Sequence, residues 1–421
     1  MATPKLRILT FSTLFPHPGQ PVHGVFVENR LRHLVASGEV EARVVAPVPW
    51  FPLTSPGLGT WGRFGSAPAY EERHGLAIWH PRYPVIPRVG MVAAPLLLYA
   101  WTRRLVRRLA AEADFDLIDA HYFYPDGVAA ALIARELGKP LVITARGTDI
   151  NLIPTFTLPR KQIQWAARQA AGLITVCDAL KRSLVDLGVP DGKVQVLRNG
   201  VDRETFRPHD RAAARAALRV SGRVLVSVGL LIERKGHDLI IDALHDLPGF
   251  TLLIVGDGPE SDALQARAHA AGVADRVRLL GELPQARLPQ VYSAADALVL
   301  ASSREGWANV LLEAMACGTP VVASDVWGTR EVVTSADAGV LMTERSAAGV
   351  AEGVRRLFSR PPDPRATRRH AELFGWDATT RGQCDLFRTI LAHASGEPAD
   401  HRTAAIPHPP VSSNSLTRPM S

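Results

Sequence analysis

Short apolar runs alternate along the chain with longer stretches in which apolar residues recur at helical spacing. Each run is bounded by polar loop residues, which is typical of a strand that is buried on both faces of a parallel sheet. The first cycle of runs covers residues 7–11, 41–46, 117–120, 141–144, 172–176 and 194–197. The second cycle covers 224–228, 251–255, 277–280, 297–301 and 320–323. Because strands that alternate with helices form parallel sheets, this α/β pattern predicts two Rossmann-like, doubly wound domains that face a central cleft.

The domain boundaries follow from the break between the two cycles. With 421 residues, the chain is too long for one ordinary domain. We expect an N-terminal domain at 1–198, a linker at 199–222 and a second domain at 223–375. A last helix is predicted at 376–392. Residues 395–421 are rich in Pro, Ser and Thr and poor in large apolar residues, so they are expected to form a disordered tail.

Composition and charge narrow the class of protein. A hydrophobic content of 47% with 21% charged residues is typical of globular domains. The net charge of +7 and the pI near 9.6 favour an anionic partner. Nucleic acid is not predicted, because the chain has neither a recognition motif nor a basic run with interleaved aromatic residues. Nucleotide phosphates and an anionic membrane face remain as candidate partners.

Targeting signals and cysteine usage favour a cytoplasmic protein. The chain has no apolar run of about 18 uncharged residues, which a transmembrane helix would need. Its N-terminus leads into a strand-like run without the pattern of a signal peptide. The three cysteines are widely spaced and form neither a disulfide framework nor a metal site. We therefore expect a reduced, cytoplasmic protein.

One predicted helix, at 95–112, concentrates positive charge on one side. At 100° per residue its arginines share a face, and these are Arg103, Arg104, Arg107 and Arg108. The opposite face is expected to carry Leu98, Trp101, Leu105 and Leu109. Such a helix either packs its leucines on the core or docks on anionic lipid, where each arginine would contribute roughly 1 kcal/mol. A nearby loop would add interfacial aromatic residues, namely Trp50, Phe51, Trp61 and Phe64.

A pair of glutamates brackets the end of a predicted strand and the start of a helix. Glu305 follows the run 297–301, and Glu313 lies in a helical stretch that begins at Asn309 and stops at Gly318. Asn309 is expected to be the N-cap, so the amides after it would face an anion near the strand's end. A nucleotide sugar needs such an anion site and carboxylates that accept hydroxyl hydrogen bonds. The spacing alone fits an exposed helix-start charge better than a binding site, because a motif match of two residues is only a hypothesis that needs its context.

The sequence around the two glutamates resembles the family 4 retaining glycosyltransferases of the GT-B fold. Their E-x7-E motif is followed by a segment similar to 313–324 of this chain, and the likeness continues through 328–333. The stretch 199–208 is similar to the linker of the same family, whose last helix crosses back onto the N-terminal domain. Segments 23–27, 124–127 and 145–149 look most like the teichuronic-acid-type branch, which hints at an acidic sugar.

For the second domain, the resemblance implies a donor site. Glu313 would bind the ribose hydroxyls, and Glu305 would bind hydroxyls of the donor sugar. Backbone amides of 309–311, together with Lys235, would stabilise charge on the leaving diphosphate. The residues that supply these amides are Asn309, Val310 and Leu311, and further donor contacts are expected at Gly256 and Leu280.

One departure from the family pattern affects the expected grip on the diphosphate. Family members carry an arginine directly after the glycine that corresponds to Gly229, whereas this chain has Leu230. Arg234 either replaces that arginine or stays a solvated loop charge.

For the first domain, the resemblance implies three further sites. His121 follows a strand, where doubly wound sheets place ligands, and would contact a hydroxyl of the transferred sugar; a lone histidine in this place is otherwise a structural residue. Arg146 stands where the family often has the histidine of H-G-x-D. It either clamps a carboxylate or forms an internal salt bridge to Asp149. Gly24 either lets a loop approach the donor phosphate or forms a simple turn.

The resemblance implies a hexosyltransferase-type reaction with retention. The acceptor hydroxyl would attack the anomeric carbon from the face that the diphosphate leaves, and the departing phosphate would take the proton. No enzyme nucleophile, metal or cofactor is expected beyond the nucleotide sugar. The acceptor would be lipid-linked or a polysaccharide, at the inner face of the plasma membrane. A GT-B nucleotide-sugar 2-epimerase and a non-catalytic GT-B binding subunit are the alternatives.

Overall fold

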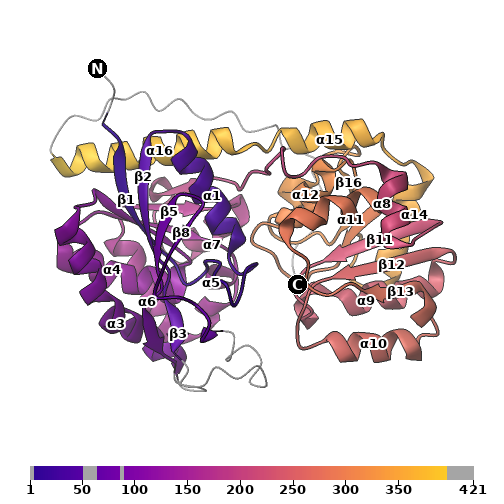
Figure 1. Cartoon of the computed structure of the whole chain (residues 1–421), viewed down its shortest axis with the longest axis horizontal. Helices are drawn as coiled ribbons and strands as arrows, with labels where there is room; N and C mark the ends of the chain where they lie inside the picture. Colours follow the sequence, from indigo (N-terminus) through magenta and orange to yellow (C-terminus); the bar gives the residue numbers. More distant parts are fainter. Residues whose placement is uncertain (1–3, 51–63, 86–89, 396–421) are drawn as a thin grey trace. The chain divides into compact units, whose positions relative to one another are not determined.

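The computed structural model describes residues 4–50, 64–85 and 90–395. The described residues divide into two compact units, one with 4–200 and 376–395 and the other with 201–375 (Figure 1). Apart from Ser395, which ends the last helix, the predicted tail lies outside the described residues. Phe51 and Trp61, predicted as interfacial aromatic residues, also lie outside them.

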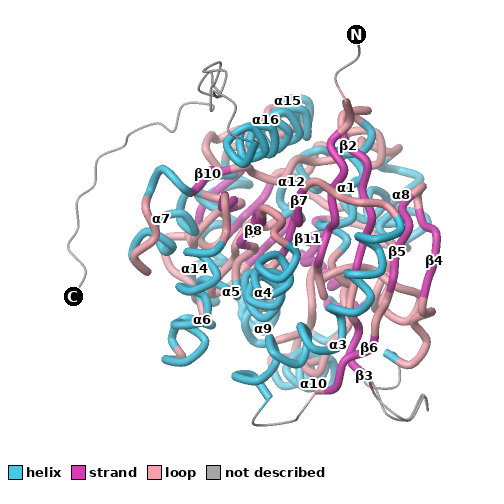
Figure 2. Tube along the Cα trace, turned by 90° about the vertical axis from the view of Figure 1, so that its left-hand side faces the viewer, coloured by secondary structure: helices cyan, strands magenta, loops and turns pink. Residues whose placement is uncertain are grey.

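The first unit contains an eight-stranded sheet in the order β10-β9-β8-β7-β1-β2-β5-β4. Its strands are β1 (Leu6–Phe11), β2 (Val40–Val45), β4 (Tyr70–Arg73), β5 (Leu76–Trp79), β7 (Leu117–His121), β8 (Leu141–Ala145), β9 (Gly172–Thr175) and β10 (Val194–Val196). All neighbours pair in parallel except β4 and β5, which form an antiparallel hairpin at one edge (Figure 2). A separate pair joins β3 (Val48–Trp50) to β6 (Arg82–Pro84).

Helices surround this sheet, and the last one comes from the end of the described chain. They are α1 (Val25–Ala36), α3 (Gly90–Glu112), α4 (Val128–Leu137), α5 (Thr148–Asn151), α6 (Thr157–Gln169), α7 (Asp178–Asp186) and α16 (Trp376–Ser395). α16, yellow in Figure 1, packs against α1, where Trp376 stacks on His33 with ring centroids 5.1 Å apart. A Cβ on Gly172 of β9 would lie 2.8 Å from Ile390 of α16, so the helix sits close to the sheet.

The second unit contains a six-stranded, wholly parallel sheet in the order β13-β12-β11-β14-β15-β16. Its strands are β11 (Arg223–Val228), β12 (Phe250–Val255), β13 (Val277–Leu279), β14 (Ala297–Leu300), β15 (Val321–Ala323) and β16 (Gly339–Leu341). Its α-helices are α8 (Arg211–Leu218), α9 (His237–Ala243), α10 (Ser261–Ala270), α11 (Leu288–Ala294), α12 (Asn309–Ala316), α13 (Thr329–Val332), α14 (Ala347–Ser359) and α15 (Pro364–Glu372). The predicted class, two doubly wound α/β units, is confirmed for each unit taken by itself.

The apolar runs of the sequence became strands because both faces of these strands are covered. Every residue of β7, β8 and β14 is buried, as expected for parallel strands in a doubly wound sheet. The strands that the apolar runs did not predict are β3, β4, β5, β6 and β16. β4, for example, alternates between exposed and partly buried positions and reads Tyr-Glu-Glu-Arg, so it has no apolar run to reveal it.

The arginine face predicted near 95–112 forms part of the longer helix α3. Leu98 and Leu109 are buried but Trp101 is exposed, so Trp101 does not share the buried face of the two leucines with which it was grouped. At 100° per residue Trp101 lies only 60° around the helix from Arg104, which explains its exposure. Within the described part of the chain, no helix has the length and apolar character needed to cross a membrane.

Candidate active site

The loops that follow β11, β12 and β14 meet backbone to backbone at one edge of the second sheet. A Cβ on Gly256 would lie 1.9 Å from the Gly229 carbonyl oxygen, and a Cβ on Gly236 would lie 2.2 Å from the Ala301 carbonyl oxygen. Both glycines have positive φ angles, which other residues rarely adopt. Glycine at these positions therefore lets the three loops come together at the carboxyl ends of the strands, where doubly wound sheets bind ligands.

Glu305 and Lys235 form an ion pair at this edge. The Lys235 Nζ donates to Glu305 Oε1 at 2.6 Å, and the Ser302 hydroxyl donates to the same oxygen at 2.7 Å. Arg234 NH1 lies 3.7 Å from Glu305 Oε2. Burial by itself would raise the pKa of Glu305, but Lys235, Arg234 and the hydrogen bonds hold that pKa below its ordinary value. Glu305 is therefore an ionised, buried hydrogen-bond acceptor.

Glu313 has a different environment from Glu305. It lies on α12 and accepts a hydrogen bond from the Tyr292 hydroxyl of α11, with 2.9 Å between Tyr292 Oη and Glu313 Oε2. Burial raises the pKa of Glu313 to about 7, and the bond from Tyr292 acts in the opposite direction. One carboxyl group of the pair is thus held ionised, whereas the other titrates near neutral pH.

The start of α12 differs from the prediction. Asn309 is the first residue of the helix and Ala308 occupies the N-cap position, so the expectation that Asn309 is the N-cap is wrong. The chain turns tightly before the helix, because the Asn309 amide donates to the Trp307 carbonyl at 3.1 Å. The Leu311 amide donates to the Ala308 carbonyl at 3.0 Å, so two of the three amides predicted to face the diphosphate bond within the loop. Val310, between them, is partly exposed.

The remaining donor-site residues surround the same edge. The Leu280 amide donates to the Ile254 carbonyl at 2.8 Å, and the next residue, Gly281, accepts from the Gly256 amide at 2.9 Å. These bonds place the segment expected to meet the nucleobase beside the Gly256 turn. Leu230 is 54% exposed, and Arg234 NH1 donates to the Arg304 carbonyl at 2.9 Å. The arginine therefore directs its charge toward the loop that carries Glu305.

In the first unit, His121 lies in a buried polar network at the carboxyl end of β7. Its Nε2 lies 3.1 Å from Asp119 Oδ2, and its Nδ1 lies 2.6 Å from Arg146 NH2. Because a guanidinium only donates, Nδ1 must accept and the proton must sit on Nε2, directed at Asp119. Burial lowers the pKa of His121 to about 4, so the ring is neutral at physiological pH. Both ring nitrogens are thus already hydrogen-bonded within the protein, and a contact with a sugar stays a prediction.

Arg146 and Asp149 are neighbours but do not form the salt bridge that was one of the two expectations. The Arg146 guanidinium bonds to His121 and, through NH1, to Asn199 Oδ1 at 3.1 Å. The Asp149 carboxylate instead accepts from backbone amides, those of Phe123 and Gly147 at 2.7 Å and that of Arg146 at 3.1 Å. These amides shape the turn after β8 and use the lone pairs that a salt bridge would need.

Gly24 has a structural role in the first loop. Its φ is +70°, and a Cβ at this position would lie 2.2 Å from the Leu14 backbone, so any other residue would require a shift of the chain. The Asp126 carboxylate fixes the same loop by accepting from the Thr13 amide at 2.7 Å. The loop geometry therefore accounts for Gly24 as a turn, and its contact with a phosphate stays a prediction.

The structure brings together the predicted residues within each unit. Lys235, Arg234 and Glu305 are in contact in the second unit, and His121 and Arg146 are in contact in the first. Sequence reasoning missed Tyr292, Ser302 and Asp119, since none of them belongs to a chemical motif that the sequence alone reveals. Across the described ranges, no three His, Cys, Asp or Glu side chains gather in a way that could hold a metal ion.

Two known protein families together match most of the chain. Residues 25–205 match the family described as Glycosyltransferase Family 4, and residues 210–374 match the family described as Glycosyl transferases group 1. A D-inositol 3-phosphate glycosyltransferase of Segniliparus rotundus is 32% identical over 324 residues, which cover 70% of this chain and 72% of that protein. The putative teichuronic acid biosynthesis glycosyltransferase TuaC of Bacillus subtilis is 28% identical, over 83% of this chain and 89% of TuaC.

Solved structures share the fold at low sequence identity. A sucrose-phosphate synthase from Thermosynechococcus elongatus has a TM-score of 0.75 at 19% identity, covering 93% of this chain and all of that one. The Anabaena protein Alr3699/HepE, solved with UDP-glucose, has a TM-score of 0.68 at 20% identity, covering 93% of this chain and 99% of its own. The chain therefore belongs to the family 4 glycosyltransferases, enzymes that transfer a sugar from a nucleotide sugar, and it has their GT-B fold.

Proposed function

We propose that this glycosyltransferase moves a sugar, with retention, from a nucleoside-diphosphate sugar to a lipid-linked or polysaccharide acceptor in cell-surface glycan biosynthesis. The observation that carries the proposal is the contact of Lys235 with Glu305 at 2.6 Å, at the carboxyl ends of β11 and β14. A cation and an ionised carboxylate side by side suit a donor whose diphosphate adjoins a ring of hydroxyl groups. A contact between lysine and glutamate can also be an ordinary ion pair. An ordinary ion pair does not need three loops that glycine residues bring together around it.

Each donor-site residue has a chemical role in this proposal. Glu305 accepts hydrogen bonds from hydroxyls of the donor sugar, and Lys235 offsets the negative charge that grows on the leaving diphosphate. Arg234, beside Glu305, supplies the second cation that Leu230 does not. Glu313 accepts from the ribose hydroxyls.

The reaction needs no covalent enzyme intermediate. The acceptor oxygen attacks the anomeric carbon while the bond from that carbon to the diphosphate oxygen breaks on the same face. The proton of the acceptor hydroxyl passes to the departing phosphate oxygen, so charge and atoms balance without an enzyme nucleophile. His121, neutral and held by Asp119 and Arg146, contacts a hydroxyl of the transferred sugar and takes no proton in this scheme.

We also propose that the enzyme works at the inner face of the plasma membrane, through the exposed face of α3. Arg104 and Trp101 are exposed there. Two neighbouring arginines are partly neutralised, since Arg107 pairs with Glu136 and Arg108 lies 3.5 Å from Glu112. The electrostatic attraction is therefore weaker than four free arginines would give, and Trp101 adds an apolar contact at the interface.

The test is a panel of nucleotide sugars offered to the purified protein with and without extracted membrane lipid and glycan acceptors. The proposal expects donor consumption that depends on an acceptor, with the anomeric configuration of the donor kept in the product. Acceptor-independent isomerisation of the donor would support the 2-epimerase alternative, and donor binding without turnover on any acceptor would support a binding subunit. A Glu352→Gln variant, changed at an exposed i,i+4 pair, serves as the control for surface substitutions.

A further inference from the structure

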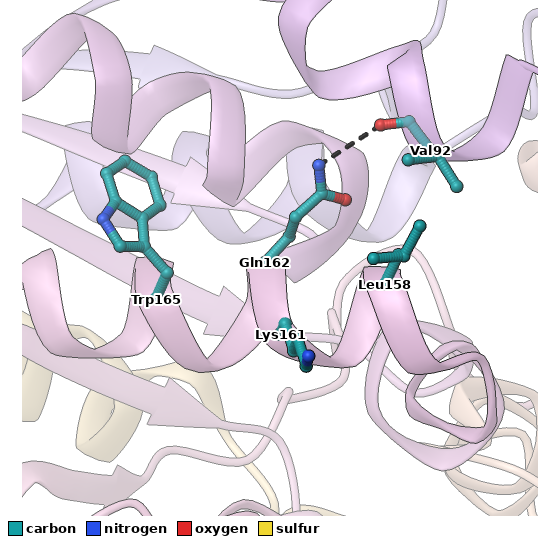
Figure 3. A pocket seen from close by; sticks show the side chains of 5 residues that line it. All are labelled: Val92, Leu158, Lys161, Gln162 and Trp165. Atoms are coloured by element: carbon teal, nitrogen blue, oxygen red, sulfur yellow. Dashed lines mark hydrogen bonds between the residues drawn. The ribbon is translucent and has the colours of Figure 1, made fainter.

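An apolar hollow opens on the first unit between the start of α3 and the first turns of α6. Its volume is about 210 Å³, and its lining is Val92 from α3 with Leu158, Lys161, Gln162 and Trp165 from α6 (Figure 3). Figure 3 shows the side chains of Val92 and Leu158 next to each other, with Trp165 further along α6. The hollow belongs to the first unit, whereas the contact of Lys235 with Glu305 belongs to the second.

The polar groups of the hollow are hydrogen-bonded among themselves. Gln162 Nε2 donates to the Val92 carbonyl at 3.2 Å, as the dashed line in Figure 3 marks. The Tyr124 hydroxyl lies 2.9 Å from Gln162 Oε1 and also contacts the Met91 carbonyl. Because these groups already have partners, the hollow offers mainly apolar surface to a ligand, and Lys161 is the one charged residue among the five that line it.

Large apolar side chains are also exposed on the segments that form the hollow. They are Met91, Val92 and Leu96 on α3 and Phe156 and Leu158 at the start of α6. Large exposed side chains that adjoin one another mark a binding surface more often than isolated ones do. Of the two helices, α6 (Thr157–Gln169) contains arginines and a lysine but no Asp or Glu, whereas α3 (Gly90–Glu112) ends in Glu112 and has two of its arginines partly neutralised. The surface therefore combines hydrocarbon with positive charge.

The position of the hollow in the fold points to the acceptor. In a parallel α/β unit each helix runs against the strands, so the first turns of α3 and α6 lie toward the carboxyl edge of the sheet. Tyr124, three residues after His121, joins this edge to Gln162 by its hydroxyl. The hollow thus adjoins the end of the first sheet where the buried network of His121 and Arg146 lies.

We propose that this hollow holds the hydrocarbon chain of a lipid-phosphate-linked acceptor, with the acceptor's phosphate beside Lys161. The proposal rests on the proposed function in one respect, the lipid-linked class of acceptor, and it adds where on this chain the lipid is bound. Aliphatic chains match the apolar lining, and the phosphate matches the positive charge that Lys161 brings to the hollow. A polysaccharide acceptor would use neither feature.

The direct test compares dodecyl phosphate with butyl phosphate, both below their aggregation concentrations, by isothermal titration calorimetry. The full-length protein is expected to bind dodecyl phosphate at least about tenfold more tightly, because burial of each additional methylene favours binding. Leu158→Glu should abolish this preference. Val185→Glu is the matched control, since Val185 is a 37% exposed apolar residue on α7 of the same unit. Equal binding of the two phosphates, or equal effects of the two variants, would overturn the proposal.

Two further measurements separate the possible sources of a lipid effect. A bromododecyl phosphate should quench the tryptophan fluorescence of the wild type more than that of Trp165→Phe. This variant is needed as a reference because the chain has eight tryptophans, which all contribute to the signal. If Leu158→Glu lowers sedimentation with anionic vesicles but leaves binding of monomeric dodecyl phosphate unchanged, the surface contacts bulk membrane and the proposal is wrong. Nucleotide-sugar binding, measured in parallel, should be unchanged in Leu158→Glu. If the wild type does not bind a nucleotide sugar, that result contradicts the proposed function and not the proposal that the hollow binds a lipid chain.

Discussion

Donor binding should depend on pH through Glu313, because this carboxyl group titrates near neutrality. Burial raises the pKa of Glu313 to about 7 from the ordinary 4.5, against the hydrogen bond from Tyr292. The carboxylate is the better acceptor for the ribose hydroxyls, since the neutral acid carries a proton on one oxygen. We therefore expect donor affinity to fall as the pH falls through about 7.

The size of the effect follows from the ionised fraction. Because apparent affinity scales with the population of the binding-competent state, the donor Kd should rise about tenfold for each pH unit below the pKa. Tyr292→Phe removes a hydrogen bond that favours the ionised form, and such bonds to charged groups contribute about 1.5–3 kcal/mol. Since about 1.4 kcal/mol corresponds to one pKa unit, the midpoint should move upward by about one to two pH units. The phenyl ring keeps the packing on Phe206, whose ring centroid lies 6.3 Å away.

The assay is calorimetric titration of a nucleotide sugar across the range from acidic to alkaline pH. A nucleotide sugar is preferable to a free nucleoside diphosphate, because the latter has a terminal phosphate that titrates in the same range. Glu313→Gln serves as the control and should bind weakly with no dependence on pH. A flat profile for the wild type, or a midpoint that Tyr292→Phe leaves in place, would refute the assignment of Glu313 to the ribose.

Three other outcomes can be measured with single substitutions. Glu305→Gln and Lys235→Ala should each lower kcat by about 10²–10³, the range for loss of one preorganised electrostatic contact; a steady-state rate near that of the wild type in either variant contradicts its role. Arg104→Glu should reduce co-sedimentation with anionic vesicles and lose this effect at high salt; unchanged sedimentation would remove α3 as the docking face. Gly236→Ala should lower the free energy of unfolding by more than Gly249→Ala, since a Cβ at Gly236 meets the Ala301 carbonyl at 2.2 Å whereas nothing lies within 4 Å at Gly249. Both glycines have positive φ. Equal losses of unfolding free energy in denaturant titrations would therefore show that backbone strain, and not the contact with Ala301, determines the effect.

The sequence predicted best those strands whose burial requires a continuous run of apolar residues. The central strands of both sheets are continuous apolar runs because they are covered on both faces, and these runs located them. The β4–β5 hairpin was not predicted, because β4 lies at an edge of the sheet and its sequence, Tyr-Glu-Glu-Arg, has no apolar run.

Site residues that act through a neighbour were harder to predict. Tyr292 reaches Glu313 across two helices, and no local pattern records that contact. The choice between Asp149 and other partners of Arg146 depended on three backbone amides that occupy the Asp149 carboxylate. Pairings of this kind are decided by the folded backbone and not by residue type.

The fixed tautomer of His121 has a consequence for how the enzyme responds to its surroundings. With Asp119 on one ring nitrogen and Arg146 on the other, and with a pKa of about 4, this ring keeps the same charge throughout the physiological range. When the pH falls from alkaline to mildly acidic, His121 of the first unit therefore keeps its charge, whereas Glu313 of the second unit changes its charge. Acidification should then weaken binding of the nucleotide sugar through Glu313, without a change of charge at His121.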